Sequence, residues 1–408
     1  MSYEVSVVRC QAYDQAQLRA AIEAGLEPLG GLAAFVHAGD RVLLKLNLLS
    51  PCIPDAAVTT HPGLVKAVIQ LVQERGATAV IGDSPGGMST EASYRALLQT
   101  TGIQQVIEET GCDVVRFDAE TTTVTSTTGR MFRQFTVAKA PLDADVVIAL
   151  PKLKTHQFAL YTGAVKLLYG YLPGLTKVEY HLHAGKSVHT FAELLLDIYE
   201  TFTPTLTIMD AVVAMEGNGP AHGTPRHLGF LLASASGPAL DYVAAELIGL
   251  DPMVVPTIRA AAQRGIGPKA VADVVVHGED PQQVPMTDFK QADTLKTASV
   301  PQWMVNLSSW LFAARPVIGR EKCIKCGRCA KSCPPQTIQF SPGQFPEIEY
   351  GKCLRCYCCH ELCPAGAVTV AKPRLHIPAG IVQHLAKLER LIKKTEGAPI
   401  LIFTLSVT

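Results

Sequence analysis

The sequence has no surplus of charge and no long apolar run, and each absence excludes a class of function. Its 408 residues contain 36 Lys and Arg against 36 Asp and Glu, so it lacks the basic surplus that suits nucleic acid. No segment approaches about 18 consecutive apolar residues, the length that crosses a membrane. The opening MSYEVSVVRC has no basic segment followed by an apolar run, as a secretory signal would. We therefore predict a cytoplasmic protein with no nucleic-acid partner and no membrane span.

Nucleotide-binding motifs are also missing. The chain contains neither a complete G-x-x-x-x-G-K-[ST] phosphate loop nor the G-x-G-x-x-G fingerprint of dinucleotide folds. The loop GDSPGG (82–87) is interpreted as a tight turn rather than a phosphate site, and His181 and His183 as solvated loop residues. A flavin is compatible with the sequence, but no motif supports one.

Cysteine is the residue type that stands out, with twelve copies. Eight of them form two runs, CIKCGRCAKSCP and CLRCYCCHELCP, which share the spacing C-x2-C-x2-C-x3-C-P and lie 30 residues apart. This is the bacterial ferredoxin pattern, in which the fourth cysteine of each run binds the cluster of the other run. We predict two [4Fe-4S] clusters. The first is assigned to Cys323, Cys326, Cys329 and Cys363, and the second to Cys353, Cys356, Cys359 and Cys333.

Other uses of these cysteines fit less well. Zinc sites usually place cysteines as separated C-x-x-C pairs, and structural disulfides are rare in reducing compartments. Cys358 falls outside the repeat. We interpret it as a spare thiol beside a cluster, and the alternative interpretation is that it is a cluster ligand. The scattered Cys10, Cys52 and Cys112 are interpreted as buried apolar residues.

Predicted strands alternate with predicted helices over residues 1–290. The strands are short β-rich runs such as YEVSVV, RVLLKLN and ATAVIGD, with amphipathic helices such as PGLVKAVIQLVQERG between them. This alternation predicts an α/β domain whose mostly parallel sheet is covered by helices. We expect a linker helix (291–320), a small ferredoxin-like α+β iron–sulfur domain (321–372), and a C-terminal helix and strand (373–408) to follow.

Polar and charged side chains follow several of the predicted strands. In open α/β sheets, ligands bind beyond the carboxyl ends of the strands, so we interpret these side chains as candidates for one cleft. The candidate catalytic residues are Lys45, Asp83, Lys152, Lys154, His156, Asp210 and Glu216, and the candidate substrate-binding residues are Asn47, Ser84 and Lys166.

Three of these candidates alternate along one segment. Lys152, Lys154 and His156 are each two residues apart, so an extended chain places them on one face. We predict that the lysines bind an anion and that His156 exchanges a proton near neutral pH. A solvated rim is the plainer alternative for lysines at strand ends. Lys45 fits that alternative poorly, because it lies inside an apolar run.

Several segments together resemble a known family. LKLN, TTHPGLVKAVIQLVQERGA, VIGDSPG, LPKLKTH, TGAVKLLYG, DAVVAMEGNGP and LDYVAAELIGLDP are similar to segments of the domain of unknown function 362 family, over roughly residues 40 to 285. Members of that family often carry a C-terminal two-cluster ferredoxin module. The resemblance implies an iron–sulfur oxidoreductase whose reaction is unassigned, and its recurring segments coincide with most of the candidate site residues.

Three functions follow from these features. The leading hypothesis is a reductase that passes low-potential electrons, supplied by a donor such as a ferredoxin or flavodoxin, to a small anionic substrate in the α/β cleft. The alternative is a ferredoxin-type electron carrier without its own substrate. A third reading is a nucleotide- or metal-dependent accessory factor, with Asp83, Asp210 and Glu216 on a cation. A deep cleft lined by lysines near a cluster would favour the reductase, whereas a flat face with an exposed cluster would favour the carrier.

Overall fold

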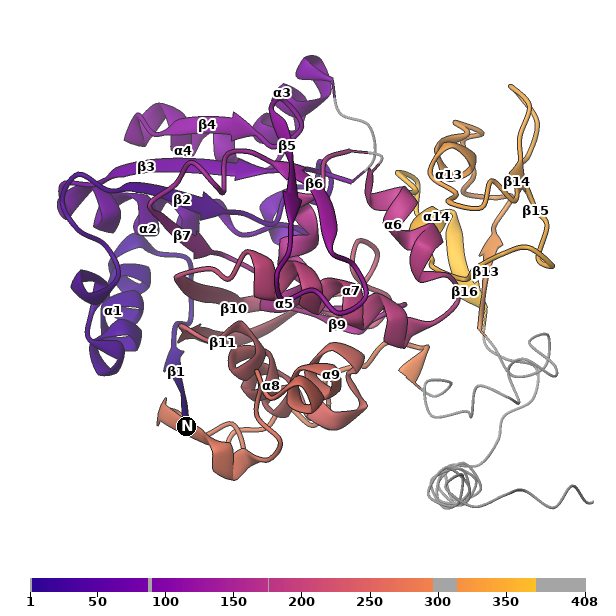
Figure 1. The fold of residues 1–408 in the computed structure, drawn as a ribbon. Coiled ribbons are helices and arrows are strands. Elements are labelled where there is room, and N and C mark those ends of the chain that lie inside the picture. Colours follow the sequence, from indigo (N-terminus) through magenta and orange to yellow (C-terminus); the bar gives the residue numbers. More distant parts are fainter. Residues whose placement is uncertain (1, 87–89, 175, 296–313, 372–408) are drawn as a thin grey trace, which may run out of the picture.

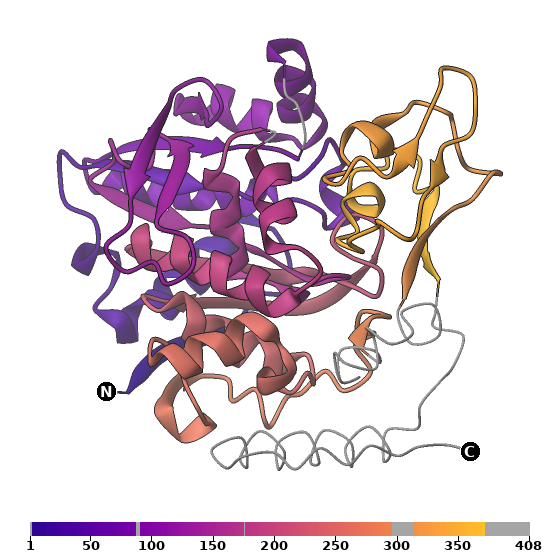
Figure 2. The same cartoon turned by 45° about the vertical axis from the view of Figure 1, so that its right-hand side comes forward.

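The structure is a computed structural model that describes residues 2–86, 90–174, 176–295 and 314–371. It has a large α/β domain and, beside it, a small ferredoxin module (314–371), drawn in orange to yellow in Figure 1. Figure 2 shows the same two parts from a second side. The predicted fold class is confirmed.

Within the described residues, the α/β domain is built on a ten-stranded sheet of order β12-β1-β11-β10-β7-β2-β3-β4, with β8 paired to β10 and β9 paired to β8. Six of the strand pairs are parallel and three are antiparallel. The strands are β1 (Tyr3–Arg9), β2 (Arg41–Lys45), β3 (Thr78–Asp83), β4 (Asp113–Arg116), β7 (Val146–Ala149), β8 (Lys152–His156), β9 (Leu160–Thr162), β10 (Leu206–Glu216), β11 (Thr224–Ser234) and β12 (Val274–Gly278).

Helices cover both faces of this sheet. Alternate residues of a strand point to opposite faces, so Val42 and Leu44 of β2 pack in one core and Leu43 packs in another. The first face is covered by α1 (Gln15–Leu26), α2 (Pro62–Glu74), α3 (Glu91–Thr100) and α4 (Ile103–Thr110). The second is covered by α5 (Ala164–Leu167), α7 (Val188–Thr201), α8 (Gly237–Leu247) and α9 (Pro256–Arg264).

Two elements beside the second face were not expected from the sequence. A hairpin of β5 (Thr121–Thr125) and β6 (Gln134–Ala138) packs over it. Helix α6 (Thr176–Ala184) holds both His181 and His183, so the interpretation of these histidines as loop residues is wrong. The apolar pattern of this segment is weak, because only His181 and Ala184 of the helix are buried.

Strand β8 also differs from the prediction, which placed its residues in a segment beyond the end of a strand. The chain passes from β7 through Pro151 directly into β8, and both strands pair in parallel with the long β10. All five residues of β8 are buried. Lys152 and Lys154 therefore lie within the sheet and not on a solvated rim.

The ferredoxin module consists of two similar halves. Its elements are β13 (Arg315–Ile318), α13 (Arg328–Lys331), β14 (Ile338–Gln339), β15 (Glu347–Ile348), α14 (Cys358–Glu361) and β16 (Val368–Ala371). Strand β13 pairs antiparallel with β16. Residues 315–318, predicted as the end of a linker helix, are therefore a strand, as Pro316 and the β-branched Val317 and Ile318 favour. The rest of that helix from 296 to 313, and the predicted helix and strand after 372, lie outside the described residues.

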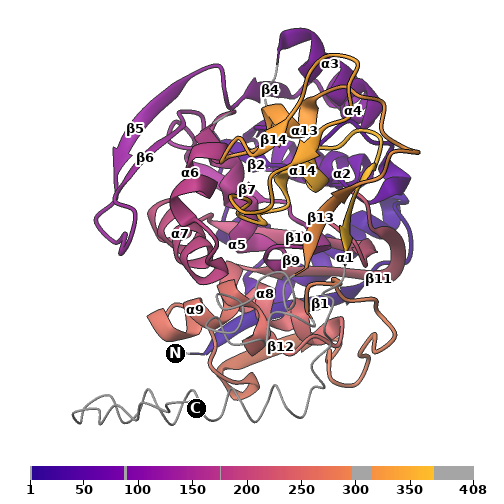
Figure 3. The same ribbon diagram turned by 90° about the vertical axis from the view of Figure 1, so that its right-hand side faces the viewer.

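The module lies at the edge of the sheet where the parallel strands end. Figure 3, with the module facing the viewer, shows it in front of β2, β7 and β10. Lys45 at the end of β2 and Asp83 at the end of β3 share a cavity with residues of α14. Among the described residues, no helix combines the length and apolarity that a membrane span requires.

Candidate functional site

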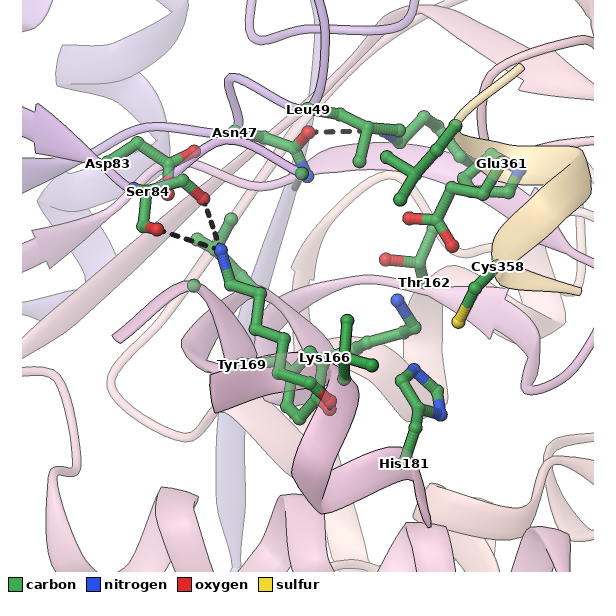
Figure 4. Close-up of a pocket in the computed structure, with 18 of the residues that line it drawn as sticks. Asn47, Leu49, Asp83, Ser84, Thr162, Lys166, Tyr169, His181, Cys358 and Glu361 are labelled. Carbon is green, nitrogen blue, oxygen red and sulfur yellow. Dashed lines mark hydrogen bonds between the residues drawn. The ribbon is translucent and has the colours of Figure 1, made fainter. Parts of the chain in front are cut away.

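A cavity of about 110 Å³ lies between the α/β domain and the ferredoxin module. This volume holds several water molecules or a small ligand. Figure 4 shows Cys358 and Glu361 of α14 directed into it, toward Lys166 and His181. Six predicted site residues line the cavity, namely Lys45, Asn47, Asp83, Ser84, Lys154 and Lys166.

Lys45 and Asp83 form a buried ion pair at the ends of β2 and β3. Lys45 Nζ donates to Asp83 Oδ1 at 2.6 Å and to the Leu46 carbonyl at 2.7 Å. The same carboxylate accepts the backbone N–H groups of Leu48 at 2.6 Å and Ser84 at 2.7 Å. Because each charge is neutralised by the other, this pair fixes two loops at the cavity and leaves little charge for a ligand.

Lys154 differs from Lys45 because it has no acidic partner within the described residues. Its Nζ donates to Asn47 Oδ1 at 3.1 Å and to the Val58 carbonyl at 2.7 Å. Burial, reinforced by the positive charge of Lys166, lowers the pKa of Lys154 to about 7. Near neutral pH this group is therefore divided between two states. The protonated amine can attract an anion, and the neutral amine can accept a proton.

Lys166 is the second lysine of the cavity that forms no ion pair within the described residues. In the part of the chain that the structure describes, its Nζ makes neither a hydrogen bond nor an ion pair, and burial lowers its pKa against the opposing charge of Glu361. Asp241 holds the short helix α5 that carries it, because the Ala164 and Val165 N–H groups donate to this carboxylate at 2.6 and 3.0 Å. Burial raises the pKa of Asp241 to about 7.

Lys177 on α6 also lines the cavity, although no pattern in the sequence pointed to it. Its Nζ donates to the Ser84 carbonyl at 2.6 Å, to Ser84 Oγ at 2.9 Å and to the Pro85 carbonyl at 3.1 Å. Burial lowers its pKa to about 8. Lys177 thus ties α6 to the loop after β3 and adds a third cation without an ion-pair partner among the described residues.

The same loop matches a catalytic pattern that sequence reasoning passed over. Residues 82–86 read G-D-S-P-G, the G-x-S-x-G pattern of a nucleophile elbow. In an elbow the serine is hydrogen-bonded to a histidine. Here Ser84 Oγ accepts hydrogen bonds from Lys177 Nζ and, at 3.3 Å, from the Gly174 N–H, and no described histidine bonds to it. The geometry is that of an anchored loop.

His156 lies beside the cavity in a different role from the one predicted. Its Nδ1 accepts the backbone N–H groups of Phe158 at 3.0 Å and Ala159 at 3.2 Å, which places the proton on Nε2, 3.6 Å from Glu361 Oε2. Burial, together with nearby Lys166, lowers the pKa of His156 to about 4. Neither its hydrogen bonds nor its lowered pKa supports proton exchange near neutral pH, which stays a prediction, and its ring stabilises a turn.

His181 is the histidine that lines the cavity. Its ring stacks on Phe191 with centroids 4.4 Å apart and lies edge-on to Tyr169 at 5.4 Å. Its buried Nδ1 has no hydrogen-bond partner among the described residues. Burial lowers the pKa of His181 to about 3, so the neutral ring offers this nitrogen to a ligand.

Three predicted catalytic residues lie away from the cavity. Lys152 Nζ donates to Asp210 Oδ2 at 2.9 Å and to Tyr13 Oη at 2.8 Å. Asp210 also accepts from Tyr13 Oη at 2.7 Å and from the His61 N–H at 3.0 Å. Glu216 instead accepts the backbone N–H of Lys290 at 3.0 Å. These groups are satisfied inside the domain, so their predicted direct role in catalysis has no support from the geometry.

The third reading, a cation site made of three carboxylates, is also excluded by this arrangement. Asp83 is paired with Lys45, Asp210 with Lys152, and Glu216 lies 3.6 Å from Lys290 Nζ. The three carboxylates have separate lysine partners and line no common cavity.

The eight motif cysteines surround two small cavities in the ferredoxin module. One is lined by Cys323, Cys326, Cys329 and Cys363, and the other by Cys333, Cys353, Cys356 and Cys359. None of the twelve cysteines, all of them among the described residues, forms a disulfide. Four thiols around a common space, with the fourth supplied by the opposite run, fit the ligand set of an iron–sulfur cluster.

Comparison with known proteins agrees with both parts of the fold. The model of a domain of unknown function (DUF362) matches residues 42–246, half of the chain. The chain belongs to this family. A model described as a 4Fe-4S dicluster domain matches residues 322–367, so the C-terminal module of this DUF362 protein is an iron–sulfur domain of the ferredoxin type. The resemblance seen in the sequence is confirmed.

One relative is the Thylakoid-associated protein sll1697 of Synechocystis sp. (strain ATCC 27184 / PCC 6803 / Kazusa). It is 38% identical over 295 residues, which are 72% of this DUF362 chain and 89% of that protein. Its name records an association with thylakoids, and the cytoplasmic location of the present protein stays a prediction.

Solved structures are less similar. The lactate racemase apoprotein from Thermoanaerobacterium thermosaccharolyticum has 12% identity and a TM-score of 0.38 over 58% of this chain and 54% of that chain. A crystal structure of a Thermotoga maritima protein has 13% identity and a TM-score of 0.34 over 55% and 56%. The chain thus spans little more than half the length of each, and neither TM-score defines a shared fold.

Proposed function

We propose that the protein is an iron–sulfur oxidoreductase that reduces a small anionic substrate in the cavity between its two domains. One observation carries this proposal: Lys154, Lys166 and Lys177, which form no ion pair within the described residues, line the same cavity as a helix of the ferredoxin module. A protein that only carried electrons would need no such cavity. The cavity also meets the requirement that a substrate be held within reach of an electron source.

The proposal includes two [4Fe-4S] clusters with the ligand sets that line the two cysteine cavities. When bound, such clusters supply single electrons at low potential. The second set lies nearer the substrate cavity, because Cys358 lines that cavity and stands between Cys356 and Cys359 of this set. The backbone turn that holds these two thiolates therefore also forms the wall of the cavity.

The lysines of the α/β domain would bind the substrate. Lys154 and Lys166 supply positive charge that described acidic groups do not neutralise by contact. A buried cation of this kind is costly unless a counter-ion arrives, so an anionic ligand is favoured at this position. His181 Nδ1, which has no hydrogen-bond partner among the described residues, is available for a hydrogen bond to the same ligand.

Reduction of a substrate also requires protons, and Lys154 is suited to donate one. Its pKa of about 7 lets it carry and release a proton at neutral pH. His156 lacks this property because its pKa lies near 4. No flavin is part of the proposal, since the chain shows no feature that calls for one.

Anaerobic purification with metal and sulfide analysis is the first test. Two clusters require about eight iron and eight sulfide per chain, and Cys358→Ser should leave both contents unchanged. Stoichiometric zinc in place of iron would overturn the cluster assignment.

Turnover is the second test. Small carboxylates, phosphates and oxyanions of sulfur and nitrogen are offered to the reduced holoprotein, and cluster reoxidation is followed optically. Lys154→Met and Lys166→Met should slow reoxidation by the active anion at least about tenfold, whereas Lys269→Met, at an exposed site, should not. If no anion in the panel reoxidises the clusters or binds, the electron-carrier alternative replaces this proposal.

A further inference from the structure

The first cysteine run presents a basic surface to solvent. We define the α13 face as Lys322, Ile324, Lys325, Arg328 and Lys331, all of them exposed. Ile324 is 65% exposed, and it lines the cavity formed by the first cysteine set. Cys326 of that set is exposed, whereas all four cysteines of the second set are buried. The α13 face therefore covers the thiolates that lie closest to solvent.

The charge of the α13 face is a local surplus. Residues 320–331 contain five basic side chains and one acidic one, Glu321, although the whole chain is balanced at 36 against 36. Within the described residues, none of the five forms an ion pair. Arg320 and Lys325 instead lie over the Phe345 ring, with 5.2 and 4.6 Å between charge and centroid. The surface thus combines several positive charges with one exposed apolar side chain, Ile324.

The internal repeat shows what the same face does in the second run. Adding 30 to Arg328 and Lys331 gives Cys358 and Glu361, which line the substrate cavity from α14. The corresponding helix face thus points inward to the ligand in one half of the module and outward to solvent in the other. The α14 face lies against the proposed substrate cavity. The equivalent α13 face is exposed, so an electron donor can reach it.

We propose that the α13 face is the docking surface for a small acidic protein that carries one electron at a time. This proposal rests on the proposed function, since an oxidoreductase without another electron source needs such a donor. Basic charge around an apolar contact matches an acidic partner and speeds its encounter. The docked carrier loses one electron to the cluster held by Cys323, Cys326, Cys329 and Cys363, and no atom or proton is exchanged.

Charge reversal on the α13 face tests the proposal through two measurements, the affinity for a carrier protein and the rate of cluster reduction. The test variant is Lys325→Glu with Arg328→Glu, and the control is Arg75→Glu with Lys269→Glu, two exposed sites on the α/β domain. Both variants change the net charge equally. An acidic flavodoxin is the probe. Its oxidised form is titrated for affinity, and its reduced form is mixed with the holoprotein to follow cluster reduction, at low and high salt.

The test variant should lose at least about tenfold in affinity and in reduction rate at low salt, and much of its salt dependence. Its iron content and its reduction by dithionite should match the wild type. Equal losses in both variants would mean that only overall charge matters, and unchanged binding in the test variant would mean that the carrier docks elsewhere. Either result overturns the proposal.

A membrane surface is the competing partner for a basic face. Vesicles containing anionic lipid are sedimented with the wild type and with the test variant. Vesicle binding that the reversal abolishes, with flavodoxin kinetics unchanged, would assign the face to lipid and overturn the proposal. Turnover is measured separately with dithionite. If flavodoxin docks on the α13 face but no anion is reduced, the docking proposal stands and only the proposed reaction is refuted.

Discussion

Lys152 and Lys154 are two residues apart on the same strand and are both buried, but they differ in what neutralises them. Lys152 has a carboxylate at 2.9 Å and a tyrosine hydroxyl at 2.8 Å. Lys154 has only an amide oxygen and a backbone carbonyl. A buried lysine therefore points to a ligand site only where the protein supplies no counter-charge. The first lysine belongs to the fold, and the second is available for a substrate.

Replacing Lys152 should produce the largest effect on stability. Lys152→Met leaves the Asp210 carboxylate buried without its cation, which costs about 3–5 kcal/mol of unfolding free energy. Urea unfolding of the anaerobic holoprotein, followed by circular dichroism, measures the loss. The double variant Lys152→Met with Asp210→Asn should recover most of it. A loss below about 1 kcal/mol in the single variant would remove the contrast between the two lysines.

Replacing Lys154 should weaken ligand binding without lowering stability. Lys154→Met removes a charged hydrogen-bond donor, which is worth about 1.5–3 kcal/mol of binding free energy, or roughly tenfold to a hundredfold in affinity. Calorimetric titration with the anion that the wild type binds most tightly measures this change. Urea unfolding should not become easier, because no buried carboxylate loses its partner and a buried charge is removed. If Lys154→Met lowered the free energy of unfolding and left anion affinity unchanged, Lys154 would be a structural residue and not a ligand-binding one.

Anion affinity and stability should both depend on pH through Lys154. The pKa of Lys154 is lowered from 10.5 to about 7, so anion affinity should fall as the pH rises through 7 and the cation is lost. In the unfolded chain the proton is held more tightly. Stability of the wild type relative to Lys154→Met should therefore rise from about pH 7 to about pH 10, by up to about 1.4 kcal/mol per unit. Parallel pH profiles for the two proteins would contradict this assignment.

The smallest effect is expected at an exposed lysine. The Lys290 side chain is 73% exposed, and its Nζ lies 3.6 Å from Glu216 Oε1. Pairs of this kind contribute about 0–1 kcal/mol, so Lys290→Ala should shift urea unfolding by less than that and leave anion affinity unchanged. The variant serves as the baseline for both buried lysines. A larger loss of stability would show that distance and exposure are poor guides to the strength of these pairs.

The sequence predicted the features that short-range chemistry determines. The spacing of the cysteines around a cluster is set by covalent geometry, and the two four-cysteine cavities follow it. The sheet and its helices follow from apolar periodicity. Lys45, Asn47, Asp83 and Ser84 were found because they follow strands whose ends meet at one edge.

Features that depend on contacts distant in the sequence were missed. Glu361 reaches the cavity from another domain, and Lys177 from a helix whose apolar stripe is too weak to read. The partner of each lysine was equally hidden, because Asp210 lies 58 residues from Lys152. Burial of β8 depends on its pairing with β10, which local propensity does not encode.

The shared wall of the cavity links cofactor content to ligand affinity. Helix α14 carries Cys359 together with Cys358 and Glu361, and a metal site generally contributes to the folding of the segment that binds it. Oxidative loss of iron should therefore open the cavity as well as stop electron supply. By reciprocity, a bound anion should slow the release of iron from the second cysteine set. Loss of iron should therefore be accompanied by a measurable loss of anion affinity.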